Sequence, residues 1–138
     1  MKQSFLLLLC IATLGLASCK KENIYYETPN RTFNYTIQKD EWVLDESVFN
    51  YTVNLNIPEL DQVTLDDEGL LVYINHPINE NSYIQVPYTY DTEAYSYELY
   101  NGGIAIDAQR SGDINTAPIK PERTIKVKIV LIPSTFVP

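Results

Sequence analysis

The sequence predicts an all-β fold, an antiparallel β-sandwich of about seven strands with an immunoglobulin-like general architecture. Apolar and polar residues alternate with a period of two from Phe33 onward, which is typical of strands with one buried face. Turn signals separate the alternating runs, and no long window keeps the period of an amphipathic helix. Both observations favour strands.

Three runs are typical strands. Residues 33–37 alternate Phe, Tyr and Ile with polar side chains. Residues 49–57 do the same until Pro58, which cannot donate to a strand ladder. Residues 125–131 place Ile, Val, Ile and Leu on one face.

Residues 70–109 predict a four-stranded meander. Asn101-Gly102 is a two-residue hairpin signal, and short connections over 91–94 and 75–81 join the earlier strands. The turns predict these cross-strand pairs: Tyr95 with Ala108, Tyr97 with Ile106, Tyr88 with Tyr97, Tyr90 with Tyr95, and Tyr73 with Tyr83. In these registers the apolar residues of the later hairpins share one face.

The start of the chain is typical of a secretory signal. Lys2 supplies a positive charge, and residues 5–16 form an apolar stretch of 12 residues. A membrane-spanning helix needs about 20. The stretch ends in Leu-Ala-Ser-Cys, which resembles the lipobox of bacterial lipoproteins, where cleavage precedes the cysteine and its sulfur receives diacylglycerol. The expected division is a signal peptide over 1–18, a lipidated N-terminus and tether over 19–31, and a sandwich domain over 32–138.

Cys19 is the expected lipidation site, and the membrane is the expected partner through that anchor. Lys20 follows it, which by resemblance to the sorting rule of enterobacterial lipoproteins favours the outer membrane. The periplasmic and the external side both stay open. Cys10 leaves with the signal, so the mature chain keeps no free thiol for a disulfide.

Composition and motifs exclude several function classes. The formal net charge is −8, so nucleic acid is not an expected partner. The single histidine, His76, excludes a multi-histidine metal site and lies in a turn, as solvated loop residues do. The sequence has no Gly-x-Ser-x-Gly motif, and the mature chain is expected to have no free cysteine thiol that could act as a nucleophile. Carboxylates over 61–68 could hold Ca²⁺, but without EF-hand spacing a solvated loop is favoured. We expect no enzymatic activity, no cofactor and no metal.

Eleven tyrosines raise the question of a ligand surface. Most of the strand tyrosines share parity with Val, Leu and Ile, so they are expected to point inward. The aromatic residues left as a candidate ligand surface are Trp42, Tyr73, Tyr83 and Tyr100.

Several motifs occur in a recognisable order. They are Trp42, Tyr51-x-Val53, Ile57-Pro58-Glu59-Leu60, Gly69-x-Leu71-Val72-Tyr73, Gln85-Val86-Pro87-Tyr88 and Val127-x-Ile129-Val130-Leu131-Ile132-Pro133. This order resembles a set of small Bacteroidota lipoproteins of unknown function. The resemblance implies envelope localisation and a β fold, and the family has no established activity to carry over. The chain lacks the Gly-Pro-rich collagen-like segment that often follows the lipidated cysteine in such proteins.

The favoured hypothesis is a membrane-anchored envelope lipoprotein that acts as a non-enzymatic binding or structural accessory module. Its partners would be envelope proteins or glycans. One alternative is a glycan-binding or, less favoured, glycan-cleaving component of an outer-membrane uptake system. Another is an assembly subunit that uses an exposed edge strand.

We expect Cys19→Ala to release soluble protein or to leave an unprocessed precursor, because the thioether cannot form. Membrane fractionation and electrophoretic mobility measure this. Unchanged membrane association and mobility would place the anchor elsewhere.

Overall fold

The computed structural model describes residues 28–112, 116–135 and 137. The predicted signal peptide, Cys19 and the predicted tether up to residue 27 lie outside the described residues. The described chain forms nine strands and a short helix. Their bounds are β1 (Arg31–Ile37), β2 (Val43–Asp45), β3 (Asn50–Asn56), α2 (Gln62–Asp67), β4 (Gly69–Asn75), β5 (Tyr83–Gln85), β6 (Tyr88–Tyr90), β7 (Glu93–Tyr100), β8 (Gly103–Arg110) and β9 (Ile125–Ile132).

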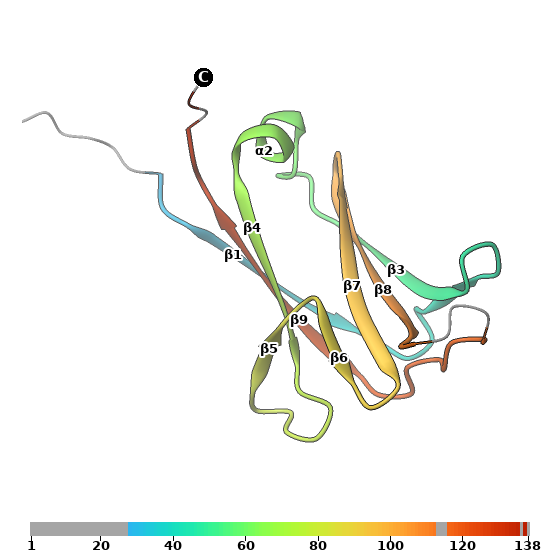
Figure 1. Ribbon diagram of the computed structural model, residues 1–138. Coiled ribbons are helices and arrows are strands. Elements are labelled where there is room, and N and C mark those ends of the chain that lie inside the picture. Colours follow the sequence, from blue (N-terminus) through green and yellow to red (C-terminus); the bar gives the residue numbers. More distant parts are fainter. Residues whose placement is uncertain (1–27, 113–115, 136, 138) are drawn as a thin grey trace, which may run out of the picture.

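The strands form two antiparallel sheets that pack against each other, so the predicted β-sandwich is confirmed (Figure 1). One sheet has four strands in the order β1-β9-β4-β5, and the other has five in the order β2-β3-β8-β7-β6. Helix α2 lies at one end of the molecule, beside the start of β4. The structure has two strands more than the expected seven. β2 was not predicted, and the strand predicted over residues 83–90 is divided into β5 and β6.

The core lies between the inner faces of the two sheets. Alternate residues of β8 and β9 point into it, and Ile104, Ile106 and Ile129 are fully buried. Burying one such side chain contributes about 1.5–3 kcal/mol relative to leaving it exposed. The period-two pattern of the sequence therefore describes the inner faces correctly.

The hairpin predicted at Asn101-Gly102 is confirmed, with Tyr97 opposite Ile106 as expected. Gly102 has a φ of 92°, a conformation that glycine adopts without steric cost. This turn joins β7 to β8 at the end of the five-stranded sheet near α2 (Figure 1).

The other two predicted registers are wrong by two residues. The observed pairs are Tyr88 with Tyr95 and Tyr90 with Glu93 in one hairpin, and Tyr73 with Gln85 and Asn75 with Tyr83 in the other. Asp91 adopts a φ of 55°, which Asp tolerates, so a tighter turn than expected connects β6 to β7. In the loop between β4 and β5, His76 N–H donates to the Ser82 carbonyl at 2.9 Å. The two strands therefore pair up to Asn75 and Tyr83, two residues farther along β4 than predicted. A shift by two residues keeps each side chain on its predicted face.

The predicted single meander over residues 70–109 is also wrong, because the chain changes sheets between β5 and β6. β5 pairs with β4 in the four-stranded sheet, whereas β6 pairs with β7 in the five-stranded one. Val86 N–H donates to the Val72 carbonyl at 2.8 Å, which holds Val86 beside β4. Pro87 has no N–H and cannot continue the ladder.

Residues 61–68 form the short helix α2 and its caps rather than the expected loop. The Asp61 carboxylate accepts a hydrogen bond from Thr64 N–H at 2.9 Å and caps the helix. This bond lowers the pKa of the Asp61 carboxyl group. Within the described residues, the helical segment is too short and too polar to cross a membrane.

Tyr95 is the largest fully buried side chain of the described residues, with 1% exposure. We expect Tyr95→Ala to lower the free energy of unfolding by about 3–5 kcal/mol, because it leaves a cavity between the sheets. Tyr83→Ala, at a site that is 41% exposed, should cost less than about 1 kcal/mol. Denaturant unfolding measures both, and equal losses would contradict the assigned faces.

Candidate ligand-binding surfaces

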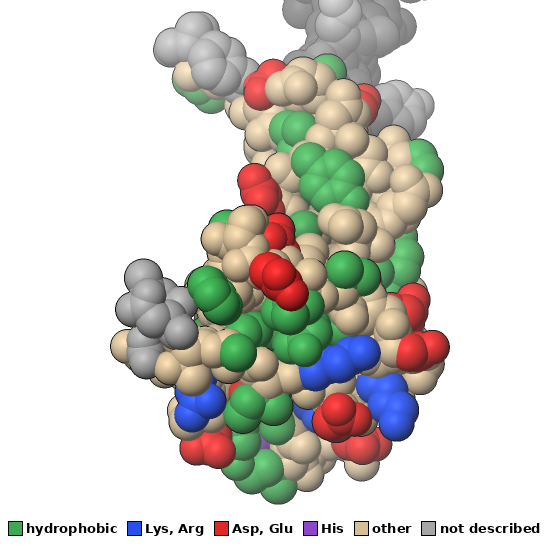
Figure 2. All heavy atoms as spheres, turned by 90° about the vertical axis from the view of Figure 1, so that its right-hand side faces the viewer, with side chains coloured by type: hydrophobic (Ala, Val, Ile, Leu, Met, Phe, Trp, Pro, Cys, Tyr) green, Lys and Arg blue, Asp and Glu red, His purple; other side chains and the backbone are tan. Residues whose placement is uncertain are grey.

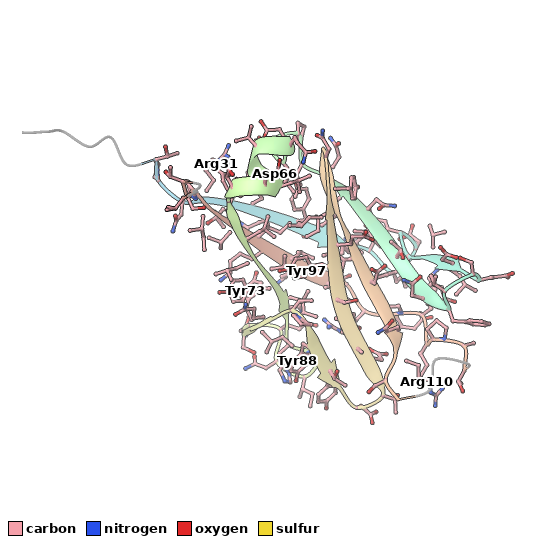
Figure 3. All side chains as sticks on the ribbon, turned by 45° about the horizontal axis from the view of Figure 1, so that its top comes forward. Arg31, Asp66, Tyr73, Tyr88, Tyr97 and Arg110 are labelled. Atoms are coloured by element: carbon pink, nitrogen blue, oxygen red, sulfur yellow. The ribbon has the colours of Figure 1, made fainter. Side chains whose placement is uncertain are left out.

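The four aromatic residues of the predicted ligand surface do not share one face. Tyr73 and Tyr83 lie on the outer face of the four-stranded sheet, and Figure 3 shows Tyr73 on the outer side of β4 while Tyr97 lies between the sheets. Tyr100 lies on the outer face of the other sheet. Trp42 is 3% exposed and belongs to the core, so its place in an exposed surface was wrong. The segment before β2 has no alternation from which its face could be predicted.

Tyr73 and Tyr83 form an aromatic ledge together with Lys128 of β9. The Lys128 ammonium lies 4.6 Å from the centroid of the Tyr73 ring and 4.8 Å from that of the Tyr83 ring. A cation over an aromatic face is worth about 0.5–1 kcal/mol at an exposed site. A ligand that stacks on these ring faces must displace the ammonium, so the ledge is poorly suited to stacking.

Tyr100 lies over the strand beside it because its cross-strand neighbour is Gly103. A Cβ atom at Gly103 would lie 2.6 Å from the Tyr100 hydroxyl oxygen and 2.8 Å from Cζ, closer than atoms can approach. The missing side chain therefore lets the ring lie down on the sheet. Tyr100 remains 39% exposed, so the ring is accessible from outside.

Beside Tyr100, the outer face of the five-stranded sheet carries an open hollow of about 460 Å³. Ala105 of the central strand is its smallest side chain, and it lies between Asn54 and Glu98 in the strand register. Because Ala105 is short, its longer neighbours form walls around it. The lining residues are Asp45, Val48, Asn50, Thr52, Asn54, Glu98, Tyr100, Ala105 and Asp107.

Asp107 is held in place within this hollow by two donors from β3. The Thr52 hydroxyl donates to Asp107 Oδ1 at 2.5 Å, and the Asn50 amide donates to the same oxygen at 3.1 Å. Both bonds end on Oδ1, so Oδ2 keeps its acceptor capacity for another group. The carboxylate is thus oriented before any ligand arrives.

The lining of the hollow holds the carboxylates of Asp45, Glu98 and Asp107 and no Lys or Arg. Figure 2 faces the right-hand side of Figure 1 and shows acidic side chains in the middle, with the visible Lys and Arg side chains in the lower half. Ser47 donates from its N–H and its hydroxyl to Asp45 Oδ1, which lowers the pKa of that carboxyl group. The hollow therefore disfavours anionic ligands.

A second cavity, of about 290 Å³, lies against the start of β7 and the segment before β9. The Arg123 guanidinium donates to Asn75 Oδ1 at 3.2 Å, and its Nη2 atom is buried without a partner among the described residues. The Tyr95 hydroxyl donates to Glu93 Oε2 at 2.7 Å. Burial, and then the hydrogen bond and charge of Glu93, raise the pKa of Tyr95, so its hydroxyl stays protonated and cannot act as a base.

This cavity was not predicted from the sequence, because Asn75 and Arg123 are far apart and follow no motif. Its lining also includes Asp91 and Glu122, so negative charge surrounds the guanidinium. Asn75 Oδ1 further accepts Lys126 N–H at 2.8 Å, which fixes the start of β9. The cluster therefore has a structural role at the end of β4.

His76, which the sequence places in a turn, makes local contacts in the loop between β4 and β5. His76 Nδ1 accepts Ile78 N–H at 3.1 Å, and its ring lies 5.6 Å from that of Tyr90, centroid to centroid. Across the part of the chain that the structure describes, no three His, Cys, Asp or Glu side chains gather where a metal ion could bind.

A scan of protein-family models, a search of curated proteins and a search of solved structures each found no match to the chain.

We expect stability to fall as the pH rises above 10.0, the ordinary pKa of tyrosine. The unfolded chain releases its Tyr95 proton there, whereas the folded chain keeps it because the folded pKa is raised. The contribution of this pKa difference to the free energy of unfolding is complete below pH 10.0 and is lost progressively above it. Tyr95→Phe should reduce the slope of unfolding free energy against pH, leaving a smaller part from Tyr35, whose pKa burial also raises. An undiminished slope in this variant would contradict the assignment.

Proposed function

We propose that this chain is a lipid-anchored protein of the cell envelope whose β-sandwich is a non-enzymatic binding module. The apolar stretch over residues 5–16 and the Leu-Ala-Ser-Cys junction support export and attachment through Cys19. Lys20 after that cysteine supports localisation to the outer membrane. The anchor keeps the domain close to its membrane, because a 13-residue tether reaches at most about 45 Å.

The hollow beside Tyr100 is the observation that carries the binding role. It combines an accessible aromatic ring with a carboxylate that two hydrogen bonds already orient. Groups held in place before binding lose little entropy when a ligand arrives, so even a shallow surface can bind usefully. The Lys128 ledge is less suitable, because its rings already contact a cation.

We expect a ligand of the envelope to be captured at the hollow in intact cells. Val48→Cys introduces an exposed thiol at the rim of the hollow, at a residue that is 61% exposed and that makes no assigned ligand contact. A thiol-reactive benzophenone attached there inserts into any bound molecule on irradiation. A mobility shift of the chain on electrophoresis measures the adduct.

Thr36→Cys is the matched control, since Thr36 is an exposed residue on the outer face of β1 in the other sheet. An adduct at Val48→Cys without one at Thr36→Cys supports the proposal. Equal adducts at both sites, or none at Val48→Cys, would contradict it. Adducts at Thr36→Cys alone would favour the alternative of an assembly subunit.

A further inference from the structure

We propose that the hollow on the outer face of the five-stranded sheet binds neutral sugar residues of a glycan. Tyr100 is the stacking platform, and Asn54, Glu98 and Asp107 bind the sugar hydroxyls. This inference rests on the proposed function, because it assigns a ligand class to the same surface.

The Tyr100 ring has the placement that a pyranose requires. Gly103 lets the ring lie over β8, so the ring is supported from beneath while 39% of the residue stays exposed. A pyranose presents a face of C–H groups, and such a face packs on an aromatic ring through apolar contact. A ring standing away from the sheet would turn its edge toward a ligand that approaches the sheet from outside.

The polar groups next to the ring match the other requirement of a sugar, which is paired hydroxyls. Asn54 supplies both a donor and an acceptor, and the carboxylates of Glu98 and Asp107 accept O–H groups. These residues project from three neighbouring strands, β3, β7 and β8. Neighbouring strands are about 4.8 Å apart, so their side chains can reach different hydroxyls of one or two sugar rings.

The charge of the hollow selects among sugars. Asp45, Glu98 and Asp107 are all acidic, and the lining holds no basic side chain. A uronic acid or a sulfated sugar would bring a further negative charge beside these three. Like charges at a binding surface oppose association, so neutral sugars are favoured over anionic ones.

The experiment titrates the purified full chain in detergent with linear neutral hexasaccharides of gluco, manno, galacto and xylo configuration. Hexagalacturonate serves as the anionic probe, and calorimetry measures the affinities. At least one neutral probe should bind saturably with a dissociation constant of about 1 mM or below, and hexagalacturonate should bind at least about tenfold more weakly.

Variants locate the binding. Tyr100→Ala and Asp107→Asn should each weaken the neutral probe about tenfold or more. Tyr83→Ala is the matched control, because Tyr83 is 41% exposed on the opposite outer face, and it should leave the affinity unchanged. Circular dichroism checks that each variant is folded. If Asp107→Asn unfolds, Asn54→Ala is tested in its place.

Three results would contradict the inference. No saturable binding of any neutral probe up to roughly 10 mM would exclude the sugar class, although an adduct at Val48→Cys would still support a binding module. Binding that is lost in Tyr83→Ala but kept in Tyr100→Ala would move the site to the Lys128 ledge. Tighter binding of hexagalacturonate than of every neutral probe would contradict the charge argument.

Discussion

Gly102 exchanges two backbone hydrogen bonds with the segment that follows β3, and much of the molecule depends on them. Its N–H donates to the Leu60 carbonyl at 2.7 Å, and its carbonyl accepts Ile57 N–H at 2.9 Å. Each bond contributes about 1 kcal/mol net, and both lie against side chains that are fully buried. They hold the tip of the β7–β8 hairpin against the end of β3. Together with the β3–β8 and β7–β8 ladders, they keep the outer faces of these three strands in one register, in which Asn54, Ala105 and Glu98 form a row.

The next residue of the same turn positions the aromatic group of the candidate site. A side chain at Gly103 would meet the Leu55 carbonyl oxygen at 2.5 Å as well as the Tyr100 ring. The ring can lie on the sheet only because this side chain is missing. On the opposite face, Lys128 lies against the rings of Tyr73 and Tyr83, so those rings are already in contact with a cation. The two outer faces thus differ in what their tyrosines can offer a ligand.

The sequence was sufficient to predict the faces of the strands and the partners within each hairpin. It did not predict the pairs between strands that are far apart in the chain. Errors of two residues in register left Tyr73 and Tyr83 on their predicted outer faces, because side-chain direction repeats every two residues. The change of sheet at Pro87 was missed, since alternation is the same whichever sheet a strand joins.

The candidate site was only partly predictable. The Asn-Gly turn sets Tyr100 opposite Gly103, so that pair follows from sequence, whereas the burial of Trp42 depends on a segment without alternation. The contact between Arg123 and Asn75 joins residues 48 positions apart and needs the folded chain.

The central claim is that ligands bind where Tyr100 lies over Gly103. The most direct test is a map of amide chemical-shift changes in the isotope-labelled chain as a neutral hexasaccharide is added. The expected changes cluster on the outer-face residues of β3, β7 and β8, with Asn54, Glu98, Tyr100 and Asp107 among the largest. Changes centred on Tyr73, Tyr83 and Lys128, with β8 unaffected, would contradict the claim.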